Sequence, residues 1–133
     1  MATKNQYFYG LGRRKASTAR ARLFGGKGVV TVNDKPVADY FCDNEAWVTE
    51  LQQPLRLIGK EKDFDITIRV SGGGLAGQVD ASKLAISKAL SVMNDDLRGT
   101  LKKAGLLKRD PREVEPKKYG LRSARKREQF SKR

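Results

Sequence analysis

The chain has 133 residues, enough for one folded domain, and its 28 Lys and Arg against 15 Asp and Glu give a net charge of +13 at pH 7. It contains no histidine and a single cysteine, Cys42, which excludes histidine-dependent nucleophilic sites, histidine-ligated metals, disulfide frameworks and thiolate zinc clusters. No apolar stretch approaches the length of a membrane span and Met1–Gln6 lack the apolar core of a signal peptide, so we expect a cytoplasmic protein without a cofactor.

The N-terminal part of the chain is patterned as strands. Aromatic and aliphatic residues alternate with others from Tyr7 to Leu11, and small apolar residues alternate with polar ones from Thr18 to Leu23. A glycine-rich turn leads into a short strand at Val29–Val32, which the turn pair Asn33-Asp34 closes. Short strands joined in this way predict an antiparallel meander.

The middle of the chain predicts a helix and then a strand. Asn44 can cap a short helix that carries Trp47 and Leu51, and Pro54 is expected to end it because proline lacks the amide hydrogen that the helix needs. The strand over Asp63–Ser71 is the clearest in the sequence, because apolar and polar residues alternate strictly along it.

Helical spacing begins after Gly72-Gly73-Gly74. One stripe is apolar and the opposite stripe is polar, which predicts a helix that covers one face of the sheet. The apolar stripe is Ala85, Ile86, Ala89, Leu90 and Met93, and the polar stripe is Asp80, Lys83, Ser87 and Ser91. A further short helix is predicted from about Asp95 to Ala104, with Gly105 capping its C-terminus.

The last part of the chain has no sustained periodicity. Residues 106–133 contain Pro111, Pro116, Gly120 and many charges, so they cannot bury enough apolar surface to fold by themselves. The predicted organisation is a folded α+β domain over residues 1–105 and a long extended basic tail over residues 106–133.

The charge is concentrated at the two ends. Residues 1–28 carry seven basic and no acidic residues, residues 29–97 carry seven basic and eleven acidic residues, and residues 98–133 carry fourteen basic and four acidic residues. A slightly acidic middle between two cationic ends is typical of a small folded body that holds basic arms against a polyanion.

Three consecutive cations follow two glycines in Gly10-Leu11-Gly12-Arg13-Arg14-Lys15. Glycines let a backbone approach another surface closely, and the cations are expected to face outward at a strand connection, which indicates a phosphate clamp. Arg20 and Arg22 on the next strand extend the positive surface. The alternative is a tight hairpin that uses the same glycines.

The triple glycine joins a strand to a helix, where free amides and the helix dipole favour a phosphate. A nucleotide-binding phosphotransferase is therefore a second functional class, although no Gly-Lys-Ser/Thr of a P-loop follows the glycines. Tight packing of strand on helix explains Gly72–Gly74 equally well. We interpret Asp80 as complementing the dipole at the helix start rather than as a catalytic acid.

Lys117–Arg133 carries eight basic residues against the single acid Glu128. The planar fork of arginine binds phosphate in two places and stacks on bases, which favours an RNA-binding tail. The alternatives are a solvated charge run and a membrane tether, but a tether also needs a lipidation site or an apolar helical face, and the tail has neither.

Taken in order and at their spacing, short motifs along nearly the whole chain resemble bacterial ribosomal protein nine of the small subunit. They are Gly10-x-Gly12-Arg13-Arg14-Lys15 with Ala19-Arg20, Val32-Asn33, Gln53-Pro54-Leu55, Val70-x-Gly72-Gly73-Gly74 with Gly77-Gln78, Ala89-Leu90, Lys103-Ala104-Gly105, and Gln129-Phe130-Ser131-Lys132-Arg133. The chain departs from the family at Val79 and Asp80, which replace small neutral residues, and at Glu128.

The resemblance implies an α+β fold with helices packed on a small mixed sheet, like the second domain of ribosomal protein S-five, and a left-handed crossover between parallel strands. It also implies a non-enzymatic constituent of the small-subunit head, bound to 16S ribosomal RNA and to neighbouring head proteins, with a tail that reaches P-site transfer RNA. The ribosomal RNA contacts would be Arg13, Arg14, Lys15, Arg20, Arg22, Gly72, Gly73, Gly74, Gln78, Lys117, Lys118, Arg122, Arg125, Lys126 and Arg127. The transfer RNA contacts would be Ser131, Lys132 and Arg133.

Overall fold

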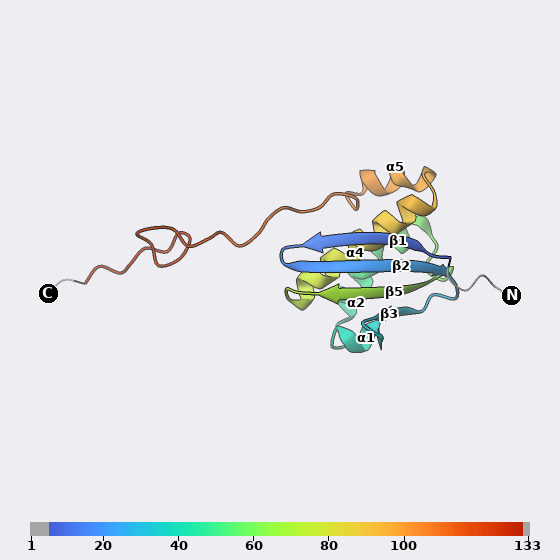
Figure 1. The fold of residues 1–133 in the computed structure, drawn as a ribbon, viewed down its shortest axis with the longest axis horizontal. Coiled ribbons are helices and arrows are strands. Elements are labelled where there is room, and N and C mark those ends of the chain that lie inside the picture. Colours follow the sequence, from blue (N-terminus) through green and yellow to red (C-terminus); the bar gives the residue numbers. More distant parts are fainter. Residues whose placement is uncertain (1–5, 132–133) are drawn as a thin grey trace.

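The structure, a computed structural model, describes residues 6–131 and has one five-stranded mixed sheet with helices packed on it, as the family resemblance implies (Figure 1). The strands are β1 (Phe8–Arg14), β2 (Ser17–Gly25), β3 (Val30–Val32), β4 (Lys35–Pro36) and β5 (Phe64–Ser71). The helices are α1 (Val37–Tyr40), α2 (Glu45–Leu51), α3 (Gln53–Ile58), α4 (Leu75–Met93) and α5 (Asp96–Lys103). None of the helices in the described part of the chain is long and apolar enough to cross a membrane.

The strand order is β1-β2-β5-β3-β4, so the predicted N-terminal meander is wrong beyond its first hairpin. β1 pairs antiparallel with β2 as expected, but β2 then pairs antiparallel with β5, and β3 lies parallel to β5. The sequence between β2 and β3 carries only the local turn signal, whereas β5 takes the central place, where both of its edges are hydrogen-bonded to neighbouring strands.

The sheet buries one face against α4. Most inward residues of the three long strands are buried, among them Ala21, Leu23, Ile66 and Ile68. In Figure 1 the strands β1, β2 and β5 lie in front of α2 and α4, so the view looks onto the face that these helices leave open. The outward residues of the same strands therefore stand on a surface that no described helix covers.

Local signals in the sequence set the ends of several helices. The Asn44 side chain accepts hydrogen bonds from the amides of Ala46 and Trp47, and it caps α2 as predicted. Pro54 was expected only to end this helix, but it also lies in the first turn of a further helix, α3. There its missing amide hydrogen costs nothing, because the first amides of a helix have no partner within the helix.

Helix α5 ends at a glycine, as the sequence predicts. Gly105 has a φ of 76°, and the amides of Gly105 and Leu106 donate to the carbonyls of Lys102 and Leu101 in a Schellman arrangement. Leu106 is still buried in the core, whereas no helix or strand follows it as far as Ser131.

Helix α4 is buried on more sides than its stripe predicts. Ser87, placed by the pattern on the polar face, is fully buried, and its hydroxyl donates to the Lys83 carbonyl at 2.8 Å. Leu84 is also buried. The reason is that α4 contacts both the sheet and the layer formed by α2, α3 and α5, so that its second face has partners of its own.

Candidate nucleic-acid interface

The two glycines of the proposed clamp pack against α4. A methyl group added at Gly10 would overlap the Ala85 carbonyl oxygen and lie 2.7 Å from the Ala89 amide nitrogen. One added at Gly12 would overlap the Ala81 carbonyl oxygen in the same way. The surface that the glycines approach is therefore the backbone of α4, on the alanine row Ala81, Ala85 and Ala89, which neither the clamp nor the hairpin interpretation foresaw.

Only two of the three consecutive cations face outward. Arg13 and Lys15 are exposed, and Lys15 lies in the hairpin turn with a φ of 52°. The side chain of Arg14 is only 14% exposed, because it shares the inward face of β1 with Gly10 and Gly12. The expectation that all three cations point outward is wrong for Arg14.

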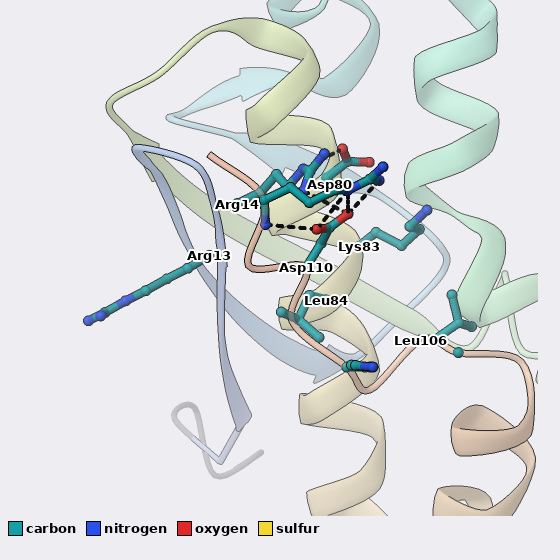
Figure 2. A pocket seen from close by; sticks show the side chains of 10 residues that line it. Arg13, Arg14, Asp80, Lys83, Leu84, Leu106 and Asp110 are labelled. Carbon is teal, nitrogen blue, oxygen red and sulfur yellow. Dashed lines mark hydrogen bonds and ion pairs between the residues drawn. The ribbon is translucent and has the colours of Figure 1, made fainter. Parts of the chain in front are cut away.

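Two carboxylates surround Arg14 on that inward face (Figure 2). Its Nη1 atom lies 2.7 Å from Asp110 Oδ2, in ion-pair contact without hydrogen-bond geometry, and its Nε atom lies 3.5 Å from Asp80 Oδ2. Asp80 of α4 therefore pairs with Arg14 of β1. Because Asp80 lies beyond the first turn of α4, where the helix dipole acts, its interpretation as a residue that complements the start of the helix is wrong.

Asp110 also binds a cation from its own segment. Its carboxylate accepts hydrogen bonds from Arg112 Nε at 3.0 Å and Nη2 at 2.7 Å. These bonds, together with the Arg112 amide and the nearby charge of Arg14, hold the pKa of Asp110 well below its usual range. The group borders a hollow of about 280 Å³, where the chain leaving α5 crosses the end of the hairpin. Figure 2 shows Arg13 pointing away from this hollow.

The outward face of the sheet carries the remaining cations of the hairpin. Arg20 and Arg22 are exposed there, as the alternation along β2 predicts. The guanidinium carbon of Arg22 lies 5.0 Å from the ring centre of Tyr7, within cation–π range. Tyr9 stands directly opposite Arg22 and is 44% exposed. Cationic and aromatic side chains thus share this face.

Loop Gly72–Gly74 lies beside the hairpin turn, because a methyl group at Gly72 would meet the Ala16 carbonyl oxygen and one at Gly73 would overlap the Ser17 hydroxyl. Gly72 and Gly73 also have positive φ values, 72° and 64°. Close packing therefore explains these two glycines, and the geometry favours that alternative over a nucleotide site. Gly74, the N-cap of α4, has open space around it.

Gln78 is buried, and its amide is used inside the protein. Its Nε2 donates to the Gly72 carbonyl at 3.1 Å, and its Oε1 accepts from the Tyr40 hydroxyl at 2.8 Å. Tyr40 itself is only half-buried. Gln78 holds the glycine loop against α1, so it positions this loop for any partner.

The six basic residues of the C-terminal segment that the resemblance gives as RNA contacts are exposed. They are Lys117, Lys118, Arg122, Arg125, Lys126 and Arg127. Glu115 pairs with Lys118 and, at 3.0 Å, with Arg125, both near the surface where ion pairs contribute little. Ser131 is exposed, whereas Lys132 and Arg133 lie outside the described residues.

Sequence reasoning missed two kinds of residue in this region. The first is Arg69, which the alternation along β5 puts on the outward face, but only the pairing of β5 with β2 sets it beside Arg20. The second is the acidic pair around Arg14, whose members are far apart in the chain. In the described residues, no group of three or more His, Cys, Asp or Glu could hold a metal ion.

Comparison with known proteins gives a consistent result. A family model described as Ribosomal protein S9/S16 matches residues 12–133. A protein of Synechococcus sp. (strain JA-3-3Ab) named small ribosomal subunit protein uS9 is 47% identical over 132 residues, covering 99% of this chain and 96% of the relative. Proteins with the same name are 47% identical in Solidesulfovibrio magneticus, covering 97% and 98%, and 49% identical in Picosynechococcus sp. (strain ATCC 27264 / PCC 7002 / PR-6), covering 95% and 92%.

Proposed function

The chain belongs to the ribosomal protein S9/S16 family, and from this premise we propose that it is a structural constituent of the small ribosomal subunit in the cytoplasm. In this proposal the folded body binds 16S ribosomal RNA in the head of the subunit, beside neighbouring head proteins. The basic segment from residue 106 onward runs through RNA, and its last residues contact transfer RNA in the P site.

The observation that carries the proposal is the charge of the open sheet face. Among the strand residues that the structure describes, the outward positions of β1, β2 and β5 hold Arg13, Arg20, Arg22 and Arg69, while Asp65 is the single carboxylate. Asp65 is already occupied, because its Oδ1 accepts three backbone amides from the loop between β2 and β3. A surface with four arginines and few acids suits the RNA backbone, whose charge dominates such binding.

The C-terminal segment supports the second half of the proposal. Its described part has nine exposed cations, and exposed aromatic side chains lie among them, with Tyr119 fully exposed and Phe130 88% exposed. Exposed aromatic rings and cations make few stabilising contacts within the protein. In RNA, unpaired bases can stack on the rings and phosphates can bind the cations. The Arg14–Asp110 ion pair connects the start of this segment to the hairpin. The basic hairpin turn and the basic C-terminal segment therefore lie at the same end of the folded body (Figure 1).

Crosslinking in cells tests the first half. The tagged full-length protein is crosslinked to RNA by ultraviolet light, and both the peptide and the nucleotide at each crosslink are sequenced. We expect crosslinks to 16S ribosomal RNA from the hairpin, the open sheet face and the segment beyond residue 106. Crosslinks spread over unrelated transcripts, or confined to one end of the chain, would contradict the proposal.

Truncation tests the second half. Deleting Ser131, Lys132 and Arg133 removes two of 28 basic residues, so incorporation into the subunit should hardly change. Binding of transfer RNA to the P site should weaken by about 1–2 kcal/mol, the order of a few partly screened charge-assisted hydrogen bonds. Because backbone contacts do not read sequence, filter binding should show similar losses for all transfer RNA species, and an unchanged affinity would rule out this role.

A further inference from the structure

Two arginines face each other on the open sheet face. Arg20 of β2 and Arg69 of β5 are directly paired in the antiparallel register, and both are exposed. Side chains at paired positions stand about 5 Å apart at Cβ, and like charges placed there destabilise a sheet. Because both side chains are exposed, packing requires neither of these charges.

Little within the protein neutralises this pair. Among residues 6–131, no carboxylate lies within ion-pair distance of Arg20. Arg69 Nη2 lies 3.6 Å from Asp34 Oδ2, but the two side chains are 64% and 76% exposed, so water and salt screen the contact. The positive charge is therefore available to an external anion.

The neighbouring rung of the same strand pair adds hydroxyl groups. Thr18 is paired with Ser71, two residues from Arg20 and Arg69 on the same face. Together with Val70, these four residues line a hollow of about 200 Å³. Two guanidinium groups and two hydroxyls around one hollow form a set of donors that matches the oxygen atoms of a phosphate.

We propose that Thr18, Arg20, Arg69 and Ser71 bind a phosphate group of the RNA backbone, a site of which the sequence motifs indicated only Arg20. The inference rests on the proposed binding of 16S ribosomal RNA and names one point of contact for it. A polymer fits better than a free anion, because the hollow is shallow and Arg13 and Arg22 continue the positive surface along the same face. Binding relieves the Arg20–Arg69 repulsion, which the free protein retains.

The test uses small subunits reconstituted without this protein and the labelled full-length chain, titrated at several salt concentrations. We expect Arg69→Gln to weaken binding roughly tenfold and to make the log–log salt slope shallower by about 0.7–0.9, the share of one phosphate contact. The double variant Thr18→Val, Ser71→Ala should weaken binding about threefold with little change in slope, because it removes donors without removing charge.

Two matched variants separate this site from general electrostatics. Arg98→Gln removes the same charge from α5, which packs on α4 rather than on the open face, and should weaken binding less than twofold. Asp34→Asn removes the acid that competes for Arg69 and should tighten binding about twofold. Equal losses for Arg69→Gln and Arg98→Gln, or weaker binding of Asp34→Asn, would overturn the site.

Folding provides an independent readout. Because Arg69→Gln relieves a like-charge pair, its melting temperature should equal or exceed that of the unaltered protein even though its binding falls. A lower melting temperature in proportion to the lost binding would mean that Arg69 acts only in folding.

Further measurements identify the source of the phosphate. Ethylation of one backbone phosphate should interfere with binding of the unaltered protein and cease to matter for Arg69→Gln. Inorganic phosphate and adenosine monophosphate should show no saturable binding to the isolated chain at millimolar concentration, and saturation by either would overturn the backbone assignment. If the unaltered protein does not bind the subunits at all, the proposed function is wrong. If it binds but the variants behave as in the contradicting outcomes above, only the phosphate site is wrong.

Discussion

On strands β1 and β2, neighbouring residues face different surroundings. Gly10 and Gly12 face α4 so closely that neither has room for a methyl group, whereas Arg13 and Arg20 extend into solvent on the opposite face. The inward positions are limited by volume, because side chains and helix backbone already fill the space. The outward positions have room for any side chain, and it is their positive charge that matters for the proposed RNA binding. Two substitutions at neighbouring positions of one strand should therefore have different effects. The one on the inward face should change stability, and the one on the outward face should change RNA binding.

The largest effect should come from Gly12→Ala. The added methyl group would overlap the Ala81 carbonyl oxygen and lie 2.6 Å from the Ala85 amide nitrogen, and both are backbone atoms of a buried helix that cannot rotate away. We expect the free energy of unfolding to fall by about 3 kcal/mol, measured by urea denaturation. Gly25→Ala is the matched control, because no atom lies within 4 Å of its added group. Equal effects of both substitutions would refute the packing constraint on the inward face.

A smaller effect should follow from Gly73→Ala in the loop that precedes α4. The substitution puts a side chain on a residue with a φ of 64° and displaces the Ser17 hydroxyl from its hydrogen bond to the Gly72 carbonyl. Together these should cost about 2 kcal/mol of unfolding free energy. Gly74→Ala should leave stability nearly unchanged, because its surroundings are open. If Gly74→Ala nevertheless weakens binding to the subunit, the loop contacts RNA as well as packing on the hairpin.

The adjacent arginines Arg13 and Arg14 sharpen the comparison further. Arg14→Gln removes the charge between Asp80 and Asp110 and should lower the unfolding free energy by about 1 kcal/mol, because the Arg14 side chain is largely buried. Arg13→Gln should change stability by less than about 0.5 kcal/mol but weaken RNA binding. Thermal melting and subunit binding measured side by side would show the two effects, and a loss of both properties in both variants would contradict the division between the faces.

The smallest effect concerns Asp65, the acid of the outward face. Backbone amides of Val29, Lys27 and Gly28 donate to its carboxylate and lower its pKa below the ordinary value of 3.8. A lowered pKa in the folded state stabilises the protein above the unfolded-state pKa, and this contribution disappears as the pH falls through the folded-state pKa. Urea denaturation from pH 6 to pH 2 should thus show a stability loss below about pH 4 that is smaller in Asp65→Asn. Identical profiles would show that these hydrogen bonds do not favour the charged form.

The sequence predicted the local structure well where the signals act over short distances. Alternation gave the two faces of β2 and β5, Asn44 gave the start of α2, and Gly105 gave the end of α5, because each signal depends on neighbours within about one turn. It missed α3, since Pro54 stops one helix and starts another with the same lack of an amide hydrogen.

The candidate site could be predicted only in part. The motif resemblance gave the family, which the comparisons confirm, and the exposure of Arg13, Lys15, Arg20 and Arg22 follows from composition and alternation. The inward turn of Arg14 did not follow, because its partners come from α4 and from the chain beyond α5. The role of Gly10 and Gly12 could not be predicted either, because glycine is used equally in tight turns, in phosphate-binding loops and where a strand packs closely on a helix.

By itself, the sequence determined the mixed α+β class, most of the helices and strands, and the excess of positive charge at both ends, because composition and short-range periodicity depend on the chain alone. The tertiary structure decided which strands are neighbours. By placing β5 between β2 and β3 it set Arg20 against Arg69, and by laying α4 across β1 it fixed Gly10 and Gly12. Strand order and helix docking depend on which apolar faces cover one another most completely, a property of the whole chain that no local stretch contains.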